Sequence, residues 1–355
     1  METITIIDPI KDLRWDKFVE NHPFGWIAHL SGWKKLLENS FPHIKGHYLA
    51  LVDISNNEIR AALPLFEVRS WLTGNRMVSI PYATLCDPLI NTNNDMEILL
   101  EDVLNLGKKL KTSYIEIRTL HSSSLIQDRR LVCHQFYKHH YLKLDKNPEV
   151  LKKSFHRTNV KQRIQRALDC DISIKIADSE SDLIKFFKLH AKTRRKLSLP
   201  PQPYIFFKLL WEMFIPLNQM ILLLAEHKNL AIAGLILFKF KDRVSAEFLA
   251  TDEEYLNISP NHLLFWEAIK SAYNDGFKIF DFGRTSPHNE SLMSFKNRWG
   301  TQVTNLPQFF YPHDVLKKVT ERETSKGYKL IQKLCKNSPE SLYQLIGRFC
   351  YRHLG

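Results

Sequence analysis

Two stretches of the chain, EIRAALPLFEV at Glu58–Val68 and LAIAGLILFKF at Leu230–Phe240, share one pattern of small and large apolar residues. Each follows a shorter apolar run and a polar turn, so each is typical of the return strand of a hairpin. The first hairpin opens with a strand at Tyr48–Val52, and the second opens with a strand at Ile221–Ala225. The sequence therefore predicts a structural unit that occurs twice; the alternative is a chance similarity of two mixed α/β halves.

The two halves also continue alike after their hairpins. An amphipathic helix predicted at 95–110 leads into a strand at Tyr114–Arg118. A second helix, predicted at 260–272 with Pro260 in its first turn, leads into a strand at Phe277–Phe282. An acetyltransferase-like core has this order of elements: a hairpin, a further strand or loop, a helix and a strand. We therefore predict an α/β fold with mixed sheets, built as two tandem lobes.

Length and composition agree with two globular lobes. The chain has 355 residues, which is longer than one hydrophobic core usually organises. Of these residues 44% are hydrophobic and 25% charged, which is an ordinary globular composition. No GxGxxG or GxxxxGK[ST] motif of nucleotide-binding loops occurs. The net charge of +12 predicts an anionic partner, which could be nucleic acid, a phosphorylated metabolite or an anionic membrane surface.

Several features predict a cytoplasmic protein. The five cysteines are scattered without CxxC spacing, which favours a reducing compartment over a disulfide framework. The first residues lack the basic patch and apolar run of a signal peptide. The longest apolar run, Ala231–Phe238, has strand length and is far shorter than the roughly twenty residues that span a bilayer.

The predicted boundaries place an N-terminal lobe at 1–145, a C-terminal lobe with the transfer site at 146–310, and a basic helical tail at 311–355. A basic helical segment joins the lobes, beginning with the Asn147 cap and including a stripe of Val160, Ile164, Ala167 and Leu168 that is predicted to be buried. In the tail, Leu342, Leu345, Ile346 and Phe349 have helical spacing, with Lys333, Lys336, Arg348 and Arg352 nearby. The tail is predicted either to contact an anionic membrane or to pack on the second lobe.

The densest group of chemically useful residues is GFKIFDFGRTSPHNESLMSFKNRWG, at 276–300. A strand ends near Asp281, and Arg284, Thr285 and Ser286 follow at its end, where α/β sheets bind ligands. Lys296 and Arg298 then follow, between Phe295 and Trp299. A lysine held beside aromatic rings could stabilise the oxyanion formed when an amine attacks an acyl carbonyl. The alternative is a surface lysine beside packing aromatics.

The same residues resemble the C-terminal signature of FemA/FemB-like proteins of the GNAT superfamily, DFGR followed by FKxxWG. Three further stretches resemble that family: HPFGWIAHLSGWKKLL at 22–37, RIQRALDCDISI at 163–174 and TRRKLSLPPQPYIFF at 193–207. The last is similar to the bacterial branch associated with exopolysaccharide and envelope gene clusters. The resemblance covers about Trp15 to Phe310 and implies two tandem GNAT-like lobes.

The resemblance further implies an enzyme that transfers an aminoacyl or acyl group to an amine. The donor would be aminoacyl-tRNA or acyl-CoA, with no tightly bound cofactor, and the acceptor an anionic envelope precursor. Lys296 would be the cation near the reacting carbonyl, while Asp281 and Arg284 would shape the pocket floor. Asp281 is also a candidate general base, with substrate assistance or water as alternatives. Arg163 and Arg166 would face phosphates of donor or acceptor.

Two departures from the family and its superfamily concern the donor. The heptads of a coiled-coil arm in the second lobe are absent, which weakens the case for a tRNA donor. The glycine-rich pyrophosphate loop of ordinary acetyltransferases is also absent, and 256–262 reads LNISPNH in its place. Phosphates could still bind the amides at the start of the following helix.

Basic side chains between the halves form a candidate anion site, with a solvated helix face as the alternative. They are Lys152, Lys153, Arg157, Lys161, Arg163, Arg166, Lys192, Arg194, Arg195 and Lys196. No recognisable DNA-binding motif accompanies them, so DNA is not an expected partner. Cys133, His134, His139 and His140 lack a second ligand pair, so no metal site is predicted. A non-catalytic module that binds a phosphorylated envelope precursor or lipid carrier, and an RNA-binding protein, remain the alternatives to an enzyme.

Overall fold

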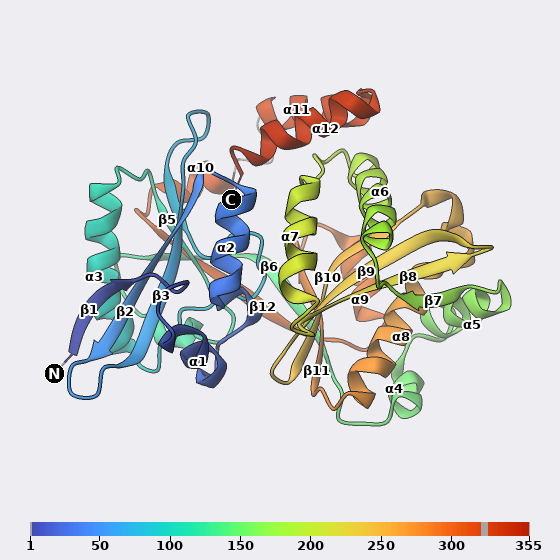
Figure 1. Cartoon of the computed structure of the whole chain (residues 1–355), viewed down its shortest axis with the longest axis horizontal. Helices are drawn as coiled ribbons and strands as arrows, with labels where there is room; N and C mark the ends of the chain where they lie inside the picture. Colours follow the sequence, from blue (N-terminus) through green and yellow to red (C-terminus); the bar gives the residue numbers. More distant parts are fainter. Residues whose placement is uncertain (1, 321–325, 355) are drawn as a thin grey trace. The chain divides into compact units, whose positions relative to one another are not determined.

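The computed structural model describes residues 2–320 and 326–354 (Figure 1). The chain divides into two compact units. The first unit comprises Met1–Phe136, Asn305–Leu330 and Gly347–Gly355, and the second comprises Tyr137–Thr304 and Ile331–Ile346. These boundaries differ from the expected division at 145 and 310, and the segment after 310 is shared between the units instead of forming a separate tail.

The first unit contains strands and helices in mixed order. They are β1 Glu2–Ile7, α1 Arg14–Asn21, α2 Ser31–Ser40, β2 Ile44–Asp53, β3 Glu58–Val68, β4 Arg76–Val78, α3 Asn93–Lys109, β5 Ile115–Arg118 and α10 Val315–Thr320, with most of β12 Gln302–Tyr311. The strand order is β1-β2-β3-β4-β5-β12. Strands β4 and β5 are parallel, and every other pair of neighbours in this order is antiparallel. Residues alternate across this sheet: Leu49 and Leu51 join the core that contains α3, whereas Tyr48 packs edge-on against Trp15 of α1.

The second unit repeats this organisation. Its elements are α4 Pro148–Ser154, the π-helical turn η3 Arg157–Lys161, α5 Gln162–Asp169, β7 Ser173–Ile176, α6 Glu180–Lys196, α7 Tyr204–Phe214, β8 Met220–His227, β9 Leu230–Phe240, β10 Arg243–Thr251, α8 Pro260–Asn274, β11 Ile279–Thr285 and α9 Glu290–Asn297, with half of β6 Val132–Lys143. The strand order is β6-β11-β10-β9-β8-β7, and here β10 and β11 are the parallel pair. Two further helices, α11 Lys326–Asn337 and α12 Glu340–Tyr351, have residues in both units.

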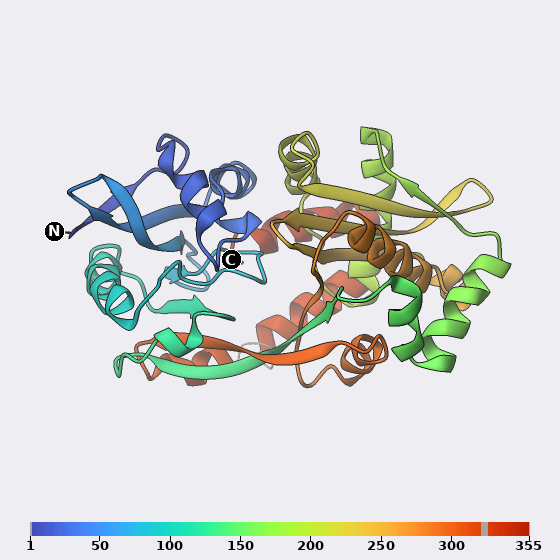
Figure 2. The same ribbon diagram turned by 90° about the horizontal axis from the view of Figure 1, so that it is seen from below.

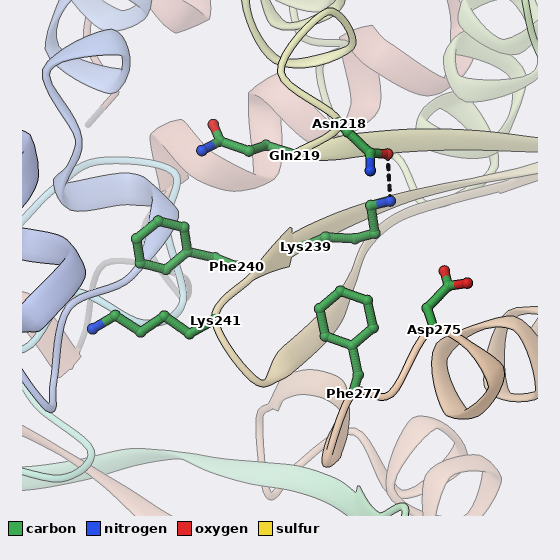
Figure 3. Close-up of a pocket in the computed structure, with 7 residues that line it drawn as sticks. All are labelled: Asn218, Gln219, Lys239, Phe240, Lys241, Asp275 and Phe277. Carbon is green, nitrogen blue, oxygen red and sulfur yellow. Dashed lines mark hydrogen bonds between the residues drawn. The ribbon is translucent and has the colours of Figure 1, made fainter.

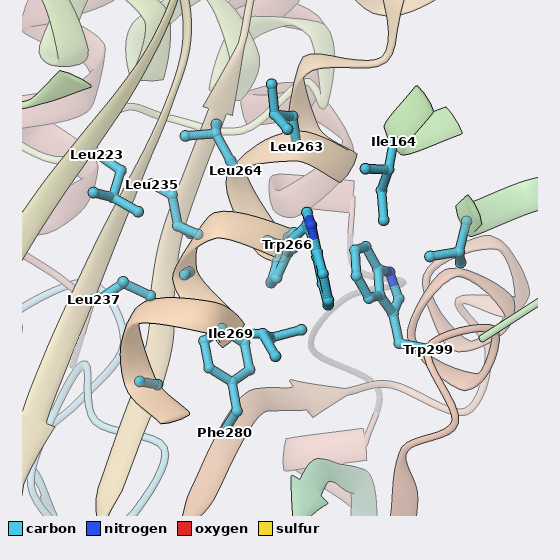
Figure 4. Close-up of a cluster of buried hydrophobic side chains, with 14 of the residues drawn as sticks. Ile164, Leu223, Leu235, Leu237, Leu263, Leu264, Trp266, Ile269, Phe280 and Trp299 are labelled. Carbon is cyan, nitrogen blue, oxygen red and sulfur yellow. The ribbon is translucent and has the colours of Figure 1, made fainter. Parts of the chain in front are cut away.

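Helices cover both faces of the second sheet, as Figure 2 shows. Gly234 of β9 points toward Phe186 of α6, whereas Leu235 and Leu237 join the core that contains α8. That core includes the side chains labelled in Figure 4, among them Trp266 of α8 and the buried Trp299. Helices α6 and α8 therefore lie on opposite faces, which follows from the alternation of side chains along a strand.

The predicted repeat is present: both units have the order hairpin, strand, helix, strand, with β2-β3-β4-α3-β5 in one and β8-β9-β10-α8-β11 in the other. The sixth strand of each sheet, however, is not the next one in the chain. Strand β6 follows β5 but pairs with β11, and β12 follows β11 but pairs with β5. This exchange is why the expected boundaries at 145 and 310 differ from the observed ones.

The basic helical segment belongs to the second unit. Val160, Ile164 and Ala167 are buried in the core that contains α8, as their spacing predicts. Leu168 is about half exposed, so its predicted burial is wrong; at 100° per residue it lies one step off the buried stripe. Asn147 caps α4 by accepting a hydrogen bond from the Glu149 amide, as predicted. Within residues 2–320 and 326–354, no helix is both long and apolar enough to cross a membrane.

Gly234 marks a close contact between sheet and helix in the second unit. A Cβ at this position would lie 2.8 Å from Phe186 Cδ2 and 3.1 Å from Leu224 Cδ2. Gly234→Ala should therefore destabilise the protein by about 1–3 kcal/mol through overpacking. Gly327→Ala is the matched control, because a Cβ there meets nothing within 4 Å. Thermal unfolding measures both, and a Gly234→Ala midpoint equal to that of Gly327→Ala would contradict this packing.

Candidate functional site

The two parallel strands of the second unit part from each other at a defined point. Strands β10 and β11 pair from Arg243 opposite Ile279 to Ser245 opposite Asp281, and both strands then continue beyond that pair. Just past it, each strand carries a bulge against its other neighbour, β10 between Ala246 and Phe248 and β11 between Asp281 and Gly283. Bulges bend a strand and redirect its groups, so the pairing of β10 with β11 ends here. The region beyond their last pair, where polar groups collect, is called the gap below.

Asp281 lies on the floor of this gap and is fully buried. Its carboxylate accepts hydrogen bonds from His139 Nε2 at 2.8 Å and 2.9 Å, Arg243 Nη1 at 2.7 Å and the Gly283 amide at 2.7 Å. Burial alone would raise the pKa of Asp281, but His139, Arg243 and the Gly283 amide hold that pKa well below its usual range. An ionised carboxylate with this many donors is a poor proton acceptor, which argues against Asp281 as the general base.

Lys296 reaches the same gap from helix α9. Its side chain is buried, with 6% of the residue exposed, so it is not the surface lysine of the alternative reading. The ammonium donates to the carbonyl oxygens of Gly283 at 3.1 Å and Arg284 at 3.0 Å. Burial lowers the pKa of Lys296 to about 8, although the charges of Asp281 and Glu247 oppose this.

The local sequence explains how Lys296 is held in place. The side chain of Asn289 caps the first turn of α9, accepting from the Leu292 amide. After α9, Trp299 is fully buried among the aromatic rings of the core, and the centres of the Trp299 and Phe155 rings are 5.2 Å apart. Gly283 has φ +72°, a conformation in which glycine is favoured, and this bulge presents the carbonyls that Lys296 contacts.

Glu247 is the extra residue in the bulge of β10 and is a further ionisable group of the gap. Its Oε1 accepts a hydrogen bond from Ser245 Oγ at 2.6 Å. Burial raises the pKa of Glu247 to about 7; Asp281 acts in the same direction, while Ser245, Arg284 and Lys296 oppose it. A carboxyl group with a pKa near neutrality can both accept and release a proton at physiological pH.

Three other side chains line this region. Arg284 lies with its guanidinium 4.7 Å from the centre of the Tyr137 ring. Thr285 is buried, and within the described residues its hydroxyl has no hydrogen-bond partner. His140 is buried, and burial together with Lys296 and His139 lowers its pKa to about 4, which makes it neutral at pH 7.

The structure thus brings together three of the predicted residues, Asp281 and Arg284 of β11 and Lys296 of α9. Thr285 and Ser286 follow Arg284 directly in the chain, and their predicted binding roles stay predictions. Sequence reasoning missed Arg243 and Glu247, and it assigned His139 to a structural cluster. The arrangement combines a cation with a carboxyl group of raised pKa, two groups that suit transfer to an amine. The amine must lose a proton, and the carbonyl oxygen gains negative charge.

Two predicted arginines lie near the start of α8. Arg163 Nη1 is 3.5 Å from Ser259 Oγ, and Arg166 Nη1 donates to the Asn257 carbonyl at 3.3 Å. Both partners belong to the segment that replaces the glycine-rich loop, and Ser259 has φ 64° directly before the helix. Positive side chains beside the first turn of a helix favour the binding of phosphate groups.

The remaining predicted arginines have other surroundings. Arg298 is exposed at the end of α9. Arg194 Nε donates to the Pro200 carbonyl at 3.1 Å. Arg195 donates to the Ser338 carbonyl at 2.8 Å, and its guanidinium lies 4.5 Å from the centre of the Tyr343 ring. These contacts connect α6 to neighbouring protein segments, so a substrate-binding role for Arg194 and Arg195 stays a prediction.

A separate pocket of about 530 Å³ lies at the other end of the second sheet (Figure 3). Its lining includes Asn218, Lys239 and Asp275, and Lys239 Nζ donates to Asn218 Oδ1 at 2.5 Å. This lining includes none of Asp281, Lys296 or Glu247, so the pocket is not the gap described above. In the described part of the chain, no group of at least three His, Cys, Asp or Glu side chains could hold a metal ion.

Residues 154–296 match the acetyltransferase (GNAT) domain family. The chain is 30% identical over 125 residues to the lipid II:glycine glycyltransferase of Staphylococcus haemolyticus (strain JCSC1435). That stretch covers 32% of this chain, and the chain spans 30% of the length of that relative.

Solved structures share the whole fold. FemX superposes with a TM-score of 0.69 at 15% identity, covering 90% of this chain and 99% of FemX. The structure of L-PGS from Bacillus licheniformis superposes with a TM-score of 0.59 at 12% identity, covering 94% of this chain and 100% of the L-PGS chain. A tandem GNAT protein from the clavulanic acid biosynthesis pathway superposes with a TM-score of 0.58 at 8% identity, covering 87% of this chain and 98% of that protein's chain. The predicted α/β fold of two tandem GNAT-like lobes is confirmed, as is the resemblance to FemA/FemB-like proteins.

Glu247 should leave a pH-dependent signature in stability. Its pKa of about 7 in the folded protein lies above the ordinary value of about 4.3 for an unfolded glutamate. Between these values the folded chain binds more protons than the unfolded chain, so this group makes the free energy of unfolding fall as the pH rises. Glu247→Gln removes that dependence, so the variant should gain stability over wild type by at most about 3 kcal/mol across this window.

Urea unfolding at several pH values between about 4.5 and 7.5 measures this difference. Glu58→Gln, which changes an exposed glutamate, is the control and should follow the wild-type pH dependence. Parallel curves for wild type and Glu247→Gln would show that the Glu247 carboxyl titrates normally.

Proposed function

We propose that this chain, a FemA/FemB-like protein of the GNAT superfamily, moves an activated acyl or aminoacyl group to an amine acceptor in cell-envelope metabolism. The single observation that carries the proposal is the buried ammonium of Lys296 at the bulged gap between β10 and β11, where Glu247 also lies. The GNAT domain match covers this gap, since residues 154–296 include both side chains.

Lys296 would stabilise the developing negative charge. When the amine nitrogen attacks the acyl carbon, the carbonyl oxygen becomes an oxyanion. A lysine ammonium has three N–H groups, and within the described residues two carbonyl contacts of Lys296 are found. A further N–H therefore remains for the substrate oxygen, in an environment of low effective dielectric where a charge acts strongly.

Glu247 would be the general base. As the new C–N bond forms, the amine must release a proton, and the Glu247 carboxylate would accept it. The C–O or C–S bond to the donor then breaks, and the leaving oxygen or sulfur takes up a proton. A pKa of about 7 suits this role, because a useful fraction of the group is ionised at neutral pH and its protonated form is readily deprotonated again.

Asp281 would act as a positioning residue. It orders His139, Arg243 and the Gly283 amide, and Gly283 in turn offers the carbonyl to Lys296. Its negative charge also helps Lys296 remain protonated despite burial. This assignment replaces the earlier candidate role of Asp281 as general base.

The donor would place its phosphate groups near Arg163 and Arg166, at the start of α8. The GNAT domain match supports an acyl-CoA type of donor. An aminoacyl-tRNA donor rests on the resemblance to FemA/FemB-like proteins alone. No tightly bound cofactor takes part in this scheme.

The acceptor would be an anionic, lipid-linked envelope precursor. This part of the proposal rests on the glycyltransferase relative, whose name specifies lipid II. The net charge of +12 supports an anionic acceptor. A location in the cytoplasm, at the inner face of the membrane, follows from the same proposal, and an exopolysaccharide precursor remains an alternative acceptor.

Lys296→Ala tests the proposed oxyanion cation. Loss of one such group typically lowers kcat by about 10²–10³-fold, and we expect a decrease of this size. The assay would offer acyl-CoA and aminoacyl-tRNA donors with a lipid-linked disaccharide-peptide acceptor and an amino-sugar acceptor. Lys188→Ala, which removes an exposed lysine of α6, should keep wild-type turnover.

Two results would contradict the proposal. Undiminished turnover of Lys296→Ala with the productive donor would remove the role of Lys296. Binding of a lipid-linked precursor by wild type, with no transfer from any donor, would instead favour the non-catalytic module.

The pH dependence of kcat/KM tests the base. Transfer needs Glu247 ionised and Lys296 protonated, with pKa values of about 7 and about 8 respectively. The profile should therefore rise through about pH 7 and fall above about pH 8, as a bell that belongs to the coupled pair. Glu247→Gln should lose most of its activity, and its residual rate should lack the acidic limb. An unchanged acidic limb in Glu247→Gln would assign the base elsewhere.

A further inference from the structure

Helix α12 exposes an apolar stripe that the protein itself does not bury. Leu342, Leu345 and Phe349 are 46%, 57% and 48% exposed. They lie at positions i, i+3 and i+7, which places them on one side of a helix. Exposed apolar residues scattered singly are ordinary, but a stripe of three large ones along one helix is a surface that favours a partner.

A different face of α12 anchors the helix. Tyr343 is fully buried, and its hydroxyl donates to the Leu199 carbonyl at 2.7 Å. It packs with Cys335 of α11 and Ala191 of α6, and Arg195 lies over its ring. The stripe is therefore a second apolar surface, separate from the one that packs α12 on the protein.

An exposed tryptophan lies close to the end of α12. Trp71, in the turn between β3 and β4, is 81% exposed, and its ring contacts His353 edge-on at 5.2 Å. His353 also contacts Phe349 of the stripe, at 5.1 Å. Leu72 beside Trp71 is exposed too. Tryptophan is the residue type that favours the boundary between lipid and water, since its ring is apolar with one polar N–H.

The charges around the stripe are almost all positive. Between Lys326 and Tyr351 the chain has five lysine or arginine residues and a single acidic one, Glu340. Glu340 is paired with Arg195 at 3.2 Å. Arg348 and Arg352 are exposed on α12 and directly after it. On α11, Leu330 and Leu334 are exposed as well, among Lys329, Lys333 and Lys336.

We propose that α12, with Trp71 near its C-terminal end, lies flat on the surface of an anionic lipid bilayer. The three side chains of the stripe enter the headgroup region, while the flanking arginines and lysines bind lipid phosphates. Charge complementarity selects this partner over a second copy of the chain, because two copies would bring like charges together. One face of α12 packs on the second unit, as one of the two predictions for the tail has it, and the inference adds the membrane contact of the other; it does not depend on the transfer chemistry.

Flotation of the purified full-length chain with vesicles tests the proposal. Wild type should float with vesicles of phosphatidylglycerol and phosphatidylcholine, and much less with phosphatidylcholine alone, with an effect that weakens at high salt. Leu345→Glu/Phe349→Glu should lower the partition coefficient at least about tenfold, because two apolar anchors are lost and negative charge is added.

Leu13→Glu/Leu217→Glu is the matched control, since it makes the same chemical change at residues that are 94% and 63% exposed elsewhere. It should bind like wild type, and so should Lys296→Ala, which separates this proposal from the proposed function. Arg348→Gln/Arg352→Gln should reduce the preference for anionic vesicles.

Three outcomes would overturn the proposal. They are failure of wild type to float with either vesicle, equal flotation of wild type and Leu345→Glu/Phe349→Glu, and equal loss in the Leu13→Glu/Leu217→Glu control. A wild-type dimer in sedimentation that becomes monomeric in Leu345→Glu/Phe349→Glu, without vesicle binding, would assign the stripe to a second copy of the chain instead.

Discussion

The divergence of two parallel strands, β10 and β11, is the constraint on which the rest of the second unit depends. Their pairing ends at Ser245 and Asp281, and bulges at Glu247 and before Gly283 follow, after which β10 still pairs with β9 and β11 with β6 but the two strands no longer pair with each other. A regular ladder would pair those backbone groups with each other. Because it does not, the carbonyls of Gly283 and Arg284 are free to accept from Lys296. The geometry of the cation is thus set by backbone, which a mutation cannot easily remove.

Asp281 and Lys296 are buried in the gap and Glu247 is partly buried, and this requires compensation, because a charge moved out of water loses its hydration. Asp281 is compensated by the four hydrogen bonds that it accepts. Lys296 and Glu247 are compensated only in part, and burial shifts the pKa of each toward the neutral form. A group whose pKa is brought close to neutral pH in this way can exchange protons with a substrate. Perturbed pKa values of this kind cluster at functional sites.

The sequence predicted the repeated hairpins because their apolar pattern depends on local alternation, which a single chain displays. It also predicted Lys296, because the aromatic residues around it are close in sequence. Glu247 could not be found in this way. The segment 247–254 contains several acidic residues, and nothing in the sequence singles out Glu247 among them. The bulge that contains Glu247 is defined only by the pairing of β10 with β9. Arg243 and His139 meet Asp281 from strands 38 and 142 residues away in the chain. The strand exchange of β6 and β12 was likewise invisible, since no local pattern encodes a long-range partner.

The two units share their connectivity but not their electrostatics, and this difference supports the proposal that the transfer chemistry takes place in the second. In the first unit the parallel pair is β4 and β5, and the cation on β5 is Arg118. Its Nε donates to Glu116 at 2.6 Å, so a carboxylate of the protein already neutralises it. Lys296 instead donates to carbonyl groups, which orient an ammonium without cancelling its charge. A cation held by dipoles keeps its field for a negative charge that arises later, and an oxyanion that forms during acyl transfer is such a charge.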